Sequence, residues 1–527
     1  MQPVFCIAPA GCGKTEALAA RVAHLVRRAD IRQPQKALAL TFSNKAKANL
    51  ATRLRSAVGV GWKTSADVMN FHGFAARVIQ AHGARIGINT AEVVLPDRIW
   101  YRRATAAVGV TWQNSASFES AMRALKSGGI SDDEVRSRLN DLEDDRVTHF
   151  QSLLEAENRI DFNDLLRLGL RALDDPEVAA LYEAHFAVVL VDEVQDLSWD
   201  QYQLVQKVAS GRASYAGDPA QGIYTFAGAD AARVITAIRS EAVETIELTS
   251  CHRSSAIVLT AVNHFGESLG SPRLICARSD TGSREFIASL VSRSPVDEAE
   301  VLVEQVSSLV QEGHAVTVGI VSRRSSRLSQ LRDHFQARGV PYEDWTVPTH
   351  DAEVVELLYM NLEVSLSSAD NAGDQLAALR ESCLSAAEPW DIDTRGEIEG
   401  AIEELAQSIS RGATLREAVQ ACRRLERIDG PVRAGIHLLN AHVGKGQEFD
   451  VVVVVGLEQG LVPDFRASDP DSLMEERRTL HVMLSRARQA LVVTCATHAV
   501  TRFGLRASDH SVWWAELEVL ATESWSR

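Results

Sequence analysis

VFCIAPAGCGKT, residues 4–15, opens the chain with a predicted strand, a glycine-containing loop and the start of a helix. Val4–Ile7 is a short apolar run typical of a buried strand, and apolar residues recur at helical spacing over 17–26. The two glycines of the loop let backbone N–H groups surround phosphate oxygens, and the helix N-terminus adds partial positive charge. The stretch is therefore typical of a phosphate-binding loop, in which Lys14 would reach the β- and γ-phosphates and Thr15 would hold Mg2+.

The loop departs from the strict GxxxxGK[ST] pattern, because Ala8 stands where the first glycine belongs. Taken alone, the stretch is also compatible with an ordinary glycine-rich turn that carries a solvated lysine. The choice between the two interpretations depends on the motifs further along the chain.

The composition bounds the class of protein. With 527 residues, the chain has room for roughly three or four domains. Its 46% hydrophobic and 24% charged residues are ordinary for a soluble globular protein, and a net charge of −15 argues against a surface that coats nucleic acid everywhere. A narrow basic channel is still compatible with that charge.

The cysteines and the apolar runs indicate the cellular compartment in which we expect the protein. Seven cysteines are dispersed without a C-x-x-C pair, which argues against zinc-ribbon and iron–sulfur sites and predicts reduced thiols. The N-terminus lacks the features of a signal peptide, and the longest apolar run, Val451–Val455, is too short to span a bilayer. We expect a soluble, cytoplasmic protein with no membrane association.

Polar segments follow the next two predicted strands. TFSNKAK (41–47) follows Ala37–Leu40, and NFHGF (70–74) follows a short strand at about 68. Carboxyl ends of parallel strands beside a phosphate-binding loop are where α/β proteins bind ligands, although a solvated, basic helix start would look similar. Residues 77–164 then lose strand character and are predicted to be mainly helical.

An adjacent pair of carboxylates supplies the second half of a nucleotide site. Val188–Val191 predicts a buried strand that ends at Asp192 and Glu193. One carboxylate can hold Mg2+ and its neighbour can accept a proton from attacking water. An acidic helix N-terminus is the structural alternative.

The second half of the chain repeats the alternation of strands and helices. We expect a second unit to start at about Ile246, with further strands at Val316–Val321, Ile436–Leu439 and Val451–Val455, and the last clear strand at Leu491–Thr494. Residues 351–430 are predicted to be helical, with helical spacing that runs through Leu425 to Gly430-Pro431. The polar motifs of this half are CHRSS (251–255), AHVGKGQEFD (441–450) and EERRTLHVMLSRAR (475–488).

Together with IDFNDLL (160–166), DEVQD (192–196) and GDPAQGIYTFAGAD (217–230), these stretches resemble, in order, the motifs of superfamily 1 helicases of the UvrD/Rep type, from residue 4 to about 494. The resemblance implies an α/β fold with two RecA-like parallel-sheet P-loop cores, each with a mainly helical insertion. The expected segments are 1–76 and 165–243 for the first core, 77–164 for its insertion, 244–350 and 431–527 for the second core and C-terminal tail, and 351–430 for a short second insertion.

The resemblance also implies the residues that act on ATP and Mg2+. Glu193 would be the base for water, Gln221 would sense the γ-phosphate, and Arg253 and Arg486 would be arginine fingers. Thr15 and Asp192 would hold the metal. The expected ATP-binding residues are Ala10, Gly11, Cys12, Gly13, Lys14, Thr15, His252 and Glu448.

Single-stranded DNA, or a duplex with a single-stranded tail, is the implied partner. Aromatic side chains in the motifs can stack on bases of any sequence, although core packing is the alternative for Phe42 and Phe226. Arg323 could serve the same strand or be a solvated turn residue. The expected DNA-binding residues are Thr41, Phe42, Asn44, His72, Tyr224, Phe226 and His442.

Several positions depart from the family pattern. His252 replaces a tyrosine that usually stacks on adenine, and Ala227 replaces an arginine. The second insertion, of about 80 residues, is much shorter than in full-length members, which leaves duplex separation open while translocation is expected. Residues 495–527 contain no nuclease-like acidic cluster. Their Trp513, Trp514 and Trp525 could form a docking surface or pack against the second insertion.

The leading hypothesis is therefore an ATP-dependent single-stranded DNA translocase or 3′-to-5′ DNA helicase. A compact chain of this kind also resembles the helicase-like subunit of Gabija antiphage systems, so the alternative is a DNA- or nucleotide-sensing regulatory ATPase that gates a separate nuclease. A non-catalytic nucleic-acid binder is disfavoured, because it would not need the complete set of ATP-handling residues. The sequence distinguishes neither DNA from RNA nor repair from defence.

Overall fold

The computed structural model describes residues 2–279, 285–312, 316–345, 350, 352–422, 432–501 and 504–525. The end of the expected second helical segment, including Leu425 and Gly430-Pro431, lies outside these residues. Among the described helices, none is long and apolar enough to cross a membrane.

The first core is built on a parallel sheet of six strands among the described residues, in the order β3-β2-β4-β5-β1-β6. β4 is buried along its whole length, as its run of Val and Leu predicts. The strands are β1 (Val4–Ile7), β2 (Lys36–Thr41), β3 (Ala66–Asn70), β4 (Phe186–Val191), β5 (Ala213–Gly217) and β6 (Glu244–Glu247). The helices packed on them include α1 (Lys14–Arg27), α2 (Asn44–Val58), α3 (Phe71–His82), α8 (Phe162–Leu173), α9 (Pro176–His185), α10 (Trp199–Ala209) and α11 (Ala231–Glu241).

The second core has a parallel sheet of seven described strands, in the order β11-β12-β10-β13-β14-β9-β17. The strands are β9 (Phe286–Ser292), β10 (Thr317–Ser322), β11 (Glu343–Asp344), β12 (Gly435–Asn440), β13 (Phe449–Val455), β14 (Ala487–Ala496) and β17 (Glu523–Ser524). Its helices are α12 (Ala256–Glu267), α13 (Pro295–Glu312), α14 (Ser329–Ala337), α19 (Pro470–Leu484) and α20 (Trp514–Leu520). Short strands β7 (Ser250–Cys251) and β8 (Ile275–Cys276) pair beside it, and β15 (His498–Thr501) and β16 (Gly504–Ala507) form a hairpin. Two parallel sheets with helices around them confirm the α/β prediction.

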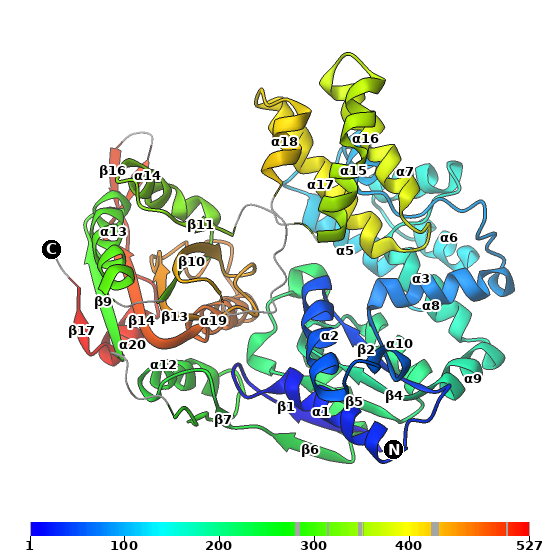
Figure 1. The fold of residues 1–527 in the computed structure, drawn as a ribbon, viewed down its shortest axis with the longest axis horizontal. Coiled ribbons are helices and arrows are strands. Elements are labelled where there is room, and N and C mark those ends of the chain that lie inside the picture. The colour runs from blue at the N-terminus through cyan, green and yellow to red at the C-terminus, as the bar shows by residue number, and fades with distance from the viewer. Residues whose placement is uncertain are drawn as a thin grey trace.

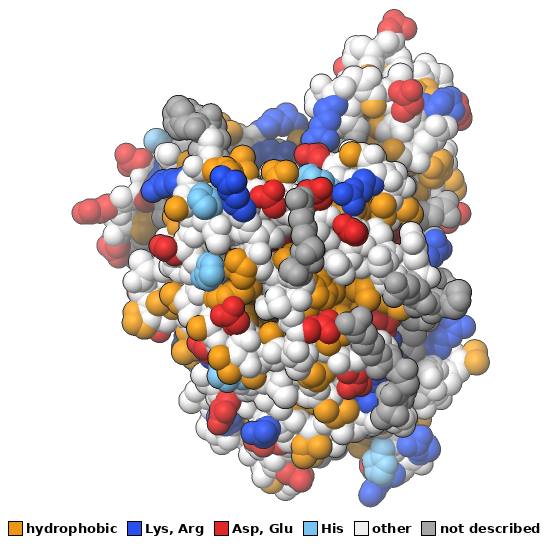
Figure 2. Space-filling model, turned by 90° about the vertical axis from the view of Figure 1, so that its left-hand side faces the viewer, with side chains coloured by type: hydrophobic (Ala, Val, Ile, Leu, Met, Phe, Trp, Pro, Cys, Tyr) orange, Lys and Arg blue, Asp and Glu red, His pale blue; other side chains and the backbone are white. Residues whose placement is uncertain are grey.

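Two helical units interrupt the cores, and each has a hydrophobic cluster of its own. The first comprises α4 (Arg98–Ala107), α5 (Ser115–Leu125), α6 (Asp132–Asn140) and α7 (Asp145–Ala156). The second comprises α15 (Ala352–Ser368), α16 (Ala372–Ala386), α17 (Ile392–Ser410) and α18 (Leu415–Ala421). The second unit is inserted between β11 and β12 of the second sheet. It lies beside the first unit, over the first core (Figure 1). Figure 2 looks onto the side where the second core lies and shows basic and acidic side chains interspersed there.

The structure corrects three expectations. β6, which was expected to open the second core, pairs with β1 in the first sheet. β14 is not the last strand, since β17 pairs with β9 at the edge of the second sheet. The expected boundary at residue 77 falls inside α3, whose buried residues belong to the first core. The two strand expectations were wrong because strand order along the chain does not specify which strands pair. The boundary was wrong because α3 continues to bury apolar residues beyond 77, including Val78 and Ile79.

The tryptophans of the tail pack in the second core rather than against the second insertion. Trp513 and Trp514 are 7% and 3% exposed and lie in the cluster formed by α12, α19 and β14. Trp525 packs beside Phe286 of β9, with ring centroids 6.1 Å apart. The tail is thus part of the second core.

Candidate nucleotide site and nucleic-acid interface

The loop between β1 and α1 has the geometry of an anion-binding turn. Gly11 and Gly13 both adopt φ 81°, which is left-handed backbone that favours glycine. Gly13 is the N-cap of α1 and provides no side-chain cap, so the first N–H groups of the helix are available for an anion. The chain packs closely against this loop, since a Cβ added to Gly11 would lie 2.5 Å from Arg253 Cβ.

Lys14 is held by the two carboxylates that follow β4. Its Nζ lies 2.5 Å from Glu193 Oε2 and 3.6 Å from Asp192 Oδ1. Burial opposes the charge of Lys14, but Glu193 and Asp192 outweigh it and raise the pKa of the lysine. Thr15 Oγ1 donates to Asp192 Oδ2 at 3.2 Å, so the hydroxyl and the carboxylate adjoin as oxygen ligands for a hard cation would.

Glu193, the residue expected to act as the base, follows β4 and pairs with Lys14. It adopts φ 56°, a left-handed conformation that is unusual outside glycine, and its Oε2 accepts from Gln195 Nε2 at 2.5 Å. Burial would raise its pKa, but Lys14 and Lys445 lower that pKa to about 2, so the carboxylate is ionised.

Gln221 and Arg486 connect the two cores. Gln221 lies in the 3₁₀ turn Pro219–Gln221 after β5, and its Oε1 accepts from Arg486 Nη2 at 3.3 Å. Its Nε2 donates to Asp218 Oδ2 at 2.7 Å. Arg486 is 2% exposed, and burial together with the charge of Arg253 lowers its pKa to about 9.

Arg253 points to the same site from the segment after β7. Its Nε donates to Glu448 Oε2 at 2.6 Å, and its Nη1 donates to the Ser485 carbonyl at 3.3 Å. His252 N donates to the Gly11 carbonyl at 2.9 Å, which seats this segment on the phosphate-binding loop. The structure therefore brings together all the residues expected around ATP.

Lys445 was missed by sequence reasoning, although it lies within AHVGKGQEFD. Its Nζ donates to both carboxylate oxygens of Asp196, at 2.6 and 2.9 Å, and to the Gln221 carbonyl at 2.8 Å. Burial raises the pKa of Asp196 to about 6, although Lys445 opposes the shift. A lysine from the second core thus holds the first core at the nucleotide site.

Aromatic side chains from both cores form a continuous group at the junction of the cores. Phe42 lies 5.0 Å from Tyr224 between ring centroids, and His442 lies 6.0 Å from Tyr224 and 5.4 Å from Phe226. Phe226 is 64% exposed, so it is not a core residue. Burial, then Arg323 and Lys445, lower the pKa of His442 to about 4, so its ring is neutral at pH 7.

The remaining expected strand-binding residues lie apart from this group. Thr41 is fully buried and its Oγ1 donates to the Ser43 carbonyl at 3.3 Å. His72 lies edge-on to Phe162, at 5.9 Å between centroids. Asn44 Nδ2 donates to Glu397 of α17 at 3.4 Å.

Acidic residues of α17 cover this part of the first core. Lys47 Nζ lies 2.7 Å from Asp393 Oδ2, and Asn70 Nδ2 donates to Asp393 Oδ1. Asn70 Nδ2 also donates to Asn44 Oδ1 at 2.9 Å. Carboxylates of the second insertion thus contact Asn44, one of the residues expected to meet the strand, and the nearby Lys47 and Asn70.

Arg323 is partly buried, with 23% of its side chain exposed, and pairs with a carboxylate. It makes a bidentate contact with Glu476, with the shortest N–O distance 2.7 Å, and its Nη1 lies 3.3 Å from His442 Nε2. Through these contacts it supports the ring of His442 from the second core.

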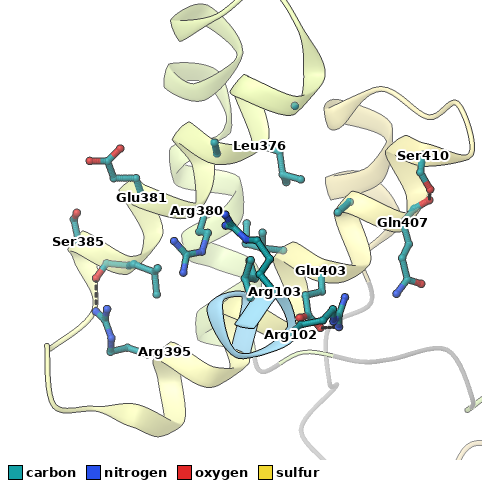
Figure 3. Close-up of a pocket in the computed structure, with 16 residues that line it drawn as sticks. Arg102, Arg103, Leu376, Arg380, Glu381, Ser385, Arg395, Glu403, Gln407 and Ser410 are labelled. Carbon is teal, nitrogen blue, oxygen red and sulfur yellow. Dashed lines mark hydrogen bonds and ion pairs between the residues drawn. The ribbon is translucent and has the colours of Figure 1, made fainter. Parts of the chain in front are cut away.

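A cavity of about 990 Å3 lies between α4 and helices α16 and α17, away from the nucleotide site (Figure 3). Arg102 pairs with Glu403 at 2.7 Å at one end of it, and Arg380 bonds to Glu399 at 2.8 Å and to Asp97. The Arg102–Glu403 and Arg380–Asp97 pairs attach the second insertion to the first, and the Arg380–Glu399 pair joins α16 to α17.

Comparisons with known proteins agree with this geometry. Residues 1–241 match the family model of the UvrD/REP helicase N-terminal domain, and residues 361–498 match that of the UvrD-like helicase C-terminal domain. The ATP-dependent DNA helicase UvrD1 of Mycobacterium tuberculosis (strain H37Rv) is 25% identical over 94% of this chain and 80% of its own length. The ATP-dependent DNA helicase PcrA of Staphylococcus aureus (strain NCTC 8325) is 23% identical over 94% of this chain and 81% of its own length.

Proposed function

The chain belongs to the UvrD/REP helicase family of ATP-dependent DNA helicases, and from this premise we propose that it couples ATP hydrolysis to 3′-to-5′ movement along single-stranded DNA. One observation carries the proposal. Lys14, Glu193 and Gln221 of the first core meet Arg253 and Arg486 of the second core around one phosphate-binding loop.

The geometry supports hydrolysis at the junction of the cores. Lys14 and the N–H groups of the loop would bind the phosphates, and Glu193 would take a proton from the attacking water. Arg253 and Arg486 would stabilise the charge that develops on the γ-phosphate. Thr15 and Asp192 supply adjoining oxygen ligands, and we assign Mg2+ to them; when bound, the ion would neutralise phosphate charge.

Coupling of ATP hydrolysis to movement is supported because the residues at the proposed ATP site come from both cores. The arginines would reach the phosphates from the second core, while Lys445 contacts Asp196 and the Gln221 carbonyl of the first. A change at the γ-phosphate would therefore alter the contact between the cores. The aromatic group that includes Tyr224, Phe226 and His442 spans the same junction. Its rings would stack on bases, and each stacked base would contribute about 1–3 kcal/mol of binding free energy.

The distribution of aromatic side chains favours a single strand over an intact duplex, because stacking requires unpaired bases. Duplex separation and the 3′-to-5′ polarity rest on the family alone. A separate nuclease partner and a role in antiphage defence stay predictions from the resemblance.

ATP hydrolysis by the purified chain, with and without single-stranded DNA, tests the proposal. We expect strong stimulation by the strand and loss of hydrolysis in Lys14→Ala. An ATP hydrolysis rate that is the same with and without single-stranded DNA would contradict the proposed coupling. Displacement of a labelled strand from duplexes with a 3′ or a 5′ tail then reports unwinding and polarity, and a single-stranded RNA competitor reports the preference for DNA.

A further inference from the structure

The cavity between the two insertions is bordered by α4 of the first and by α16 and α17 of the second (Figure 3). Ile99 of α4 packs against the hydrophobic cluster of the second insertion. Arg98 lies along α17, since a Cβ added to Gly400 would lie 3.6 Å from Arg98 Nη1. The cavity thus lies among packed helices. Its volume of about 990 Å3 is at the upper end of the range of about 300–1,000 Å3 that is typical of small-molecule sites.

The charged side chains that line this cavity are mainly basic. They are Arg102, Arg103, Arg380, Arg395, Glu381 and Glu403. Arg102 pairs with Glu403 at 2.7 Å, but Arg103 has neither a hydrogen bond nor an ion pair with any described residue. Arg395 donates to the Leu384 carbonyl at 2.9 Å and pairs with no described carboxylate. Glu381 points away from Arg103 (Figure 3). The guanidinium charges of Arg103 and Arg395 therefore favour an anion in the cavity.

Arg380 contributes an unsatisfied donor to the same cavity. Its Nη2 donates to Glu399 Oε1 at 2.8 Å and to Asp97. Its Nε is buried and has no hydrogen-bond partner among the described residues. Buried N–H groups in folded proteins nearly always have an acceptor, and an acceptor atom bound in the cavity would satisfy this one.

Apolar side chains form the rest of the wall. They are Ile99, Leu376, Ala377, Leu384, Ile402 and Ala406. An inorganic anion would leave this apolar surface in contact with water, whereas an organic anion would cover it, and the burial of apolar surface is favourable. The lining therefore suits a ligand that combines negative charge with an apolar group.

We propose that this cavity binds a small organic phosphate, which joins the two insertions. A phosphate monoester carries about 1.5–2 negative charges at neutral pH and offers three acceptor oxygens, and arginine binds such oxygens bidentately. Arg103 and Arg395 would pair with the phosphate, and Arg380 Nε would donate to one of its oxygens. The ester group would rest on Leu376 and Ile402.

A ligand bound there would hold α16 and α17 against α4. None of the residues that line the cavity belongs to the proposed ATP site or to the aromatic group between the cores. The inference is therefore independent of the proposed function, and the failure of one would leave the other standing.

Naphthyl phosphate, an aromatic phosphate ester, is the probe for the full chain. A fluorescence titration measures its Kd, and hydrogen exchange followed by mass spectrometry locates its site. We expect saturable binding with slower exchange in α4, α16 and α17. Lys14→Ala should bind the probe equally well, because Lys14 lies in the loop between β1 and α1. No saturable binding at millimolar probe, or slower exchange in that loop without a change in the three helices, would overturn the proposal.

Arg103→Gln is the deciding variant, because it removes a charge from the cavity without breaking a contact to any described residue. It should weaken probe binding by about 10-fold, which corresponds to about 1.4 kcal/mol. Arg239→Gln, at an exposed arginine of α11 outside the cavity, should leave the Kd unchanged. The same Kd for Arg103→Gln as for the unaltered chain would refute the assignment.

Two further ligands test the chemistry of the site. Naphthol, which lacks the phosphate, should bind at least about 10-fold more weakly than the probe; equal binding would show an apolar surface only and overturn the proposal. Slower exchange of the three helices with double-stranded DNA, but not with the probe, would assign the arginines to a nucleic-acid backbone and would also overturn it. If Arg103→Gln fails to fold, the exchange patterns of the unaltered chain with the probe and with naphthol decide alone.

Discussion

Replacing Asp393 with asparagine tests whether α17 competes with single-stranded DNA for the first core. Asp393 accepts from Lys47 at 2.7 Å and from the Asn70 amide, and its side chain is 11% exposed. A carboxylate there holds donors that a strand phosphate would otherwise use. Asp393→Asn keeps the size of the side chain and removes its charge, so it should let the strand displace α17 more easily.

The size of the effect follows from these two contacts. Lys47 is 36% exposed, so its ion pair contributes about 0.2–1 kcal/mol, and the Asn70 hydrogen bond to a carboxylate contributes about 1 kcal/mol. Together they oppose strand binding by about 1–2 kcal/mol, which corresponds to about 5- to 30-fold in Kd. The full gain requires that α17 is docked in nearly all molecules and that the strand breaks both contacts.

Fluorescence anisotropy of a labelled oligodeoxythymidine, at one fixed salt concentration, measures this change, because strand affinity depends strongly on salt. Glu403→Gln is the matched control: it removes a carboxylate from the same helix, but one that pairs with Arg102 of the first insertion. We expect a tighter Kd for Asp393→Asn and little change for the control. Unchanged or weaker strand binding by Asp393→Asn, with its thermal stability intact, would refute the reasoning.

Three further predictions concern residues at the junction of the two cores. Glu193→Gln should still bind ATP but lose about 10²- to 10⁴-fold in turnover, because it removes the base; near-normal turnover in steady-state assays would show that another group takes the proton. Joint replacement of Tyr224 and Phe226 by alanine should weaken single-strand binding by about 1–3 kcal/mol for each base that loses its stacking partner and leave ATP affinity unchanged; equal losses in both titrations would indicate a packing role. Burial raises the pKa of Asp196 from 3.8 to about 6, so this carboxyl stabilises the fold when protonated, and that contribution is lost as the pH rises through 6. Melting temperatures measured from pH 4 to 7 should therefore fall less steeply with pH in Asp196→Asn, and an unchanged slope would contradict the assignment.

Local patterns were sufficient for much of the fold. The apolar runs that became β1, β4, β10 and β13 are buried strands, because a strand between two layers of helices must be apolar on both faces. The strand–loop–Lys-Thr–helix order of residues 4–15 specified the anion-binding turn, since glycine is needed for the left-handed conformations at Gly11 and Gly13.

Other strands could not be assigned from local patterns. β6 is exposed and only four residues long, and its place in the first sheet depends on pairing with β1. β17 has two residues and is a strand only because β9 lies beside it. The same limit explains why the sequence left open whether the tail tryptophans form a docking surface or pack against the second insertion, whereas Trp513 and Trp514 pack in the second core.

For the candidate site, sequence determined the identity of the reactive groups and tertiary structure determined their partners. A motif needs a residue type at a fixed position, so Lys14 and Glu193 were predicted from local patterns, whereas the role of Arg486 was predicted from the resemblance to the helicase motifs. Lys445 with Asp196 and Asp393 with Lys47 are contacts between residues more than two hundred positions apart. Such contacts depend on how the sheets and insertions pack, because side chains distant along the chain interact only once the fold has brought them together.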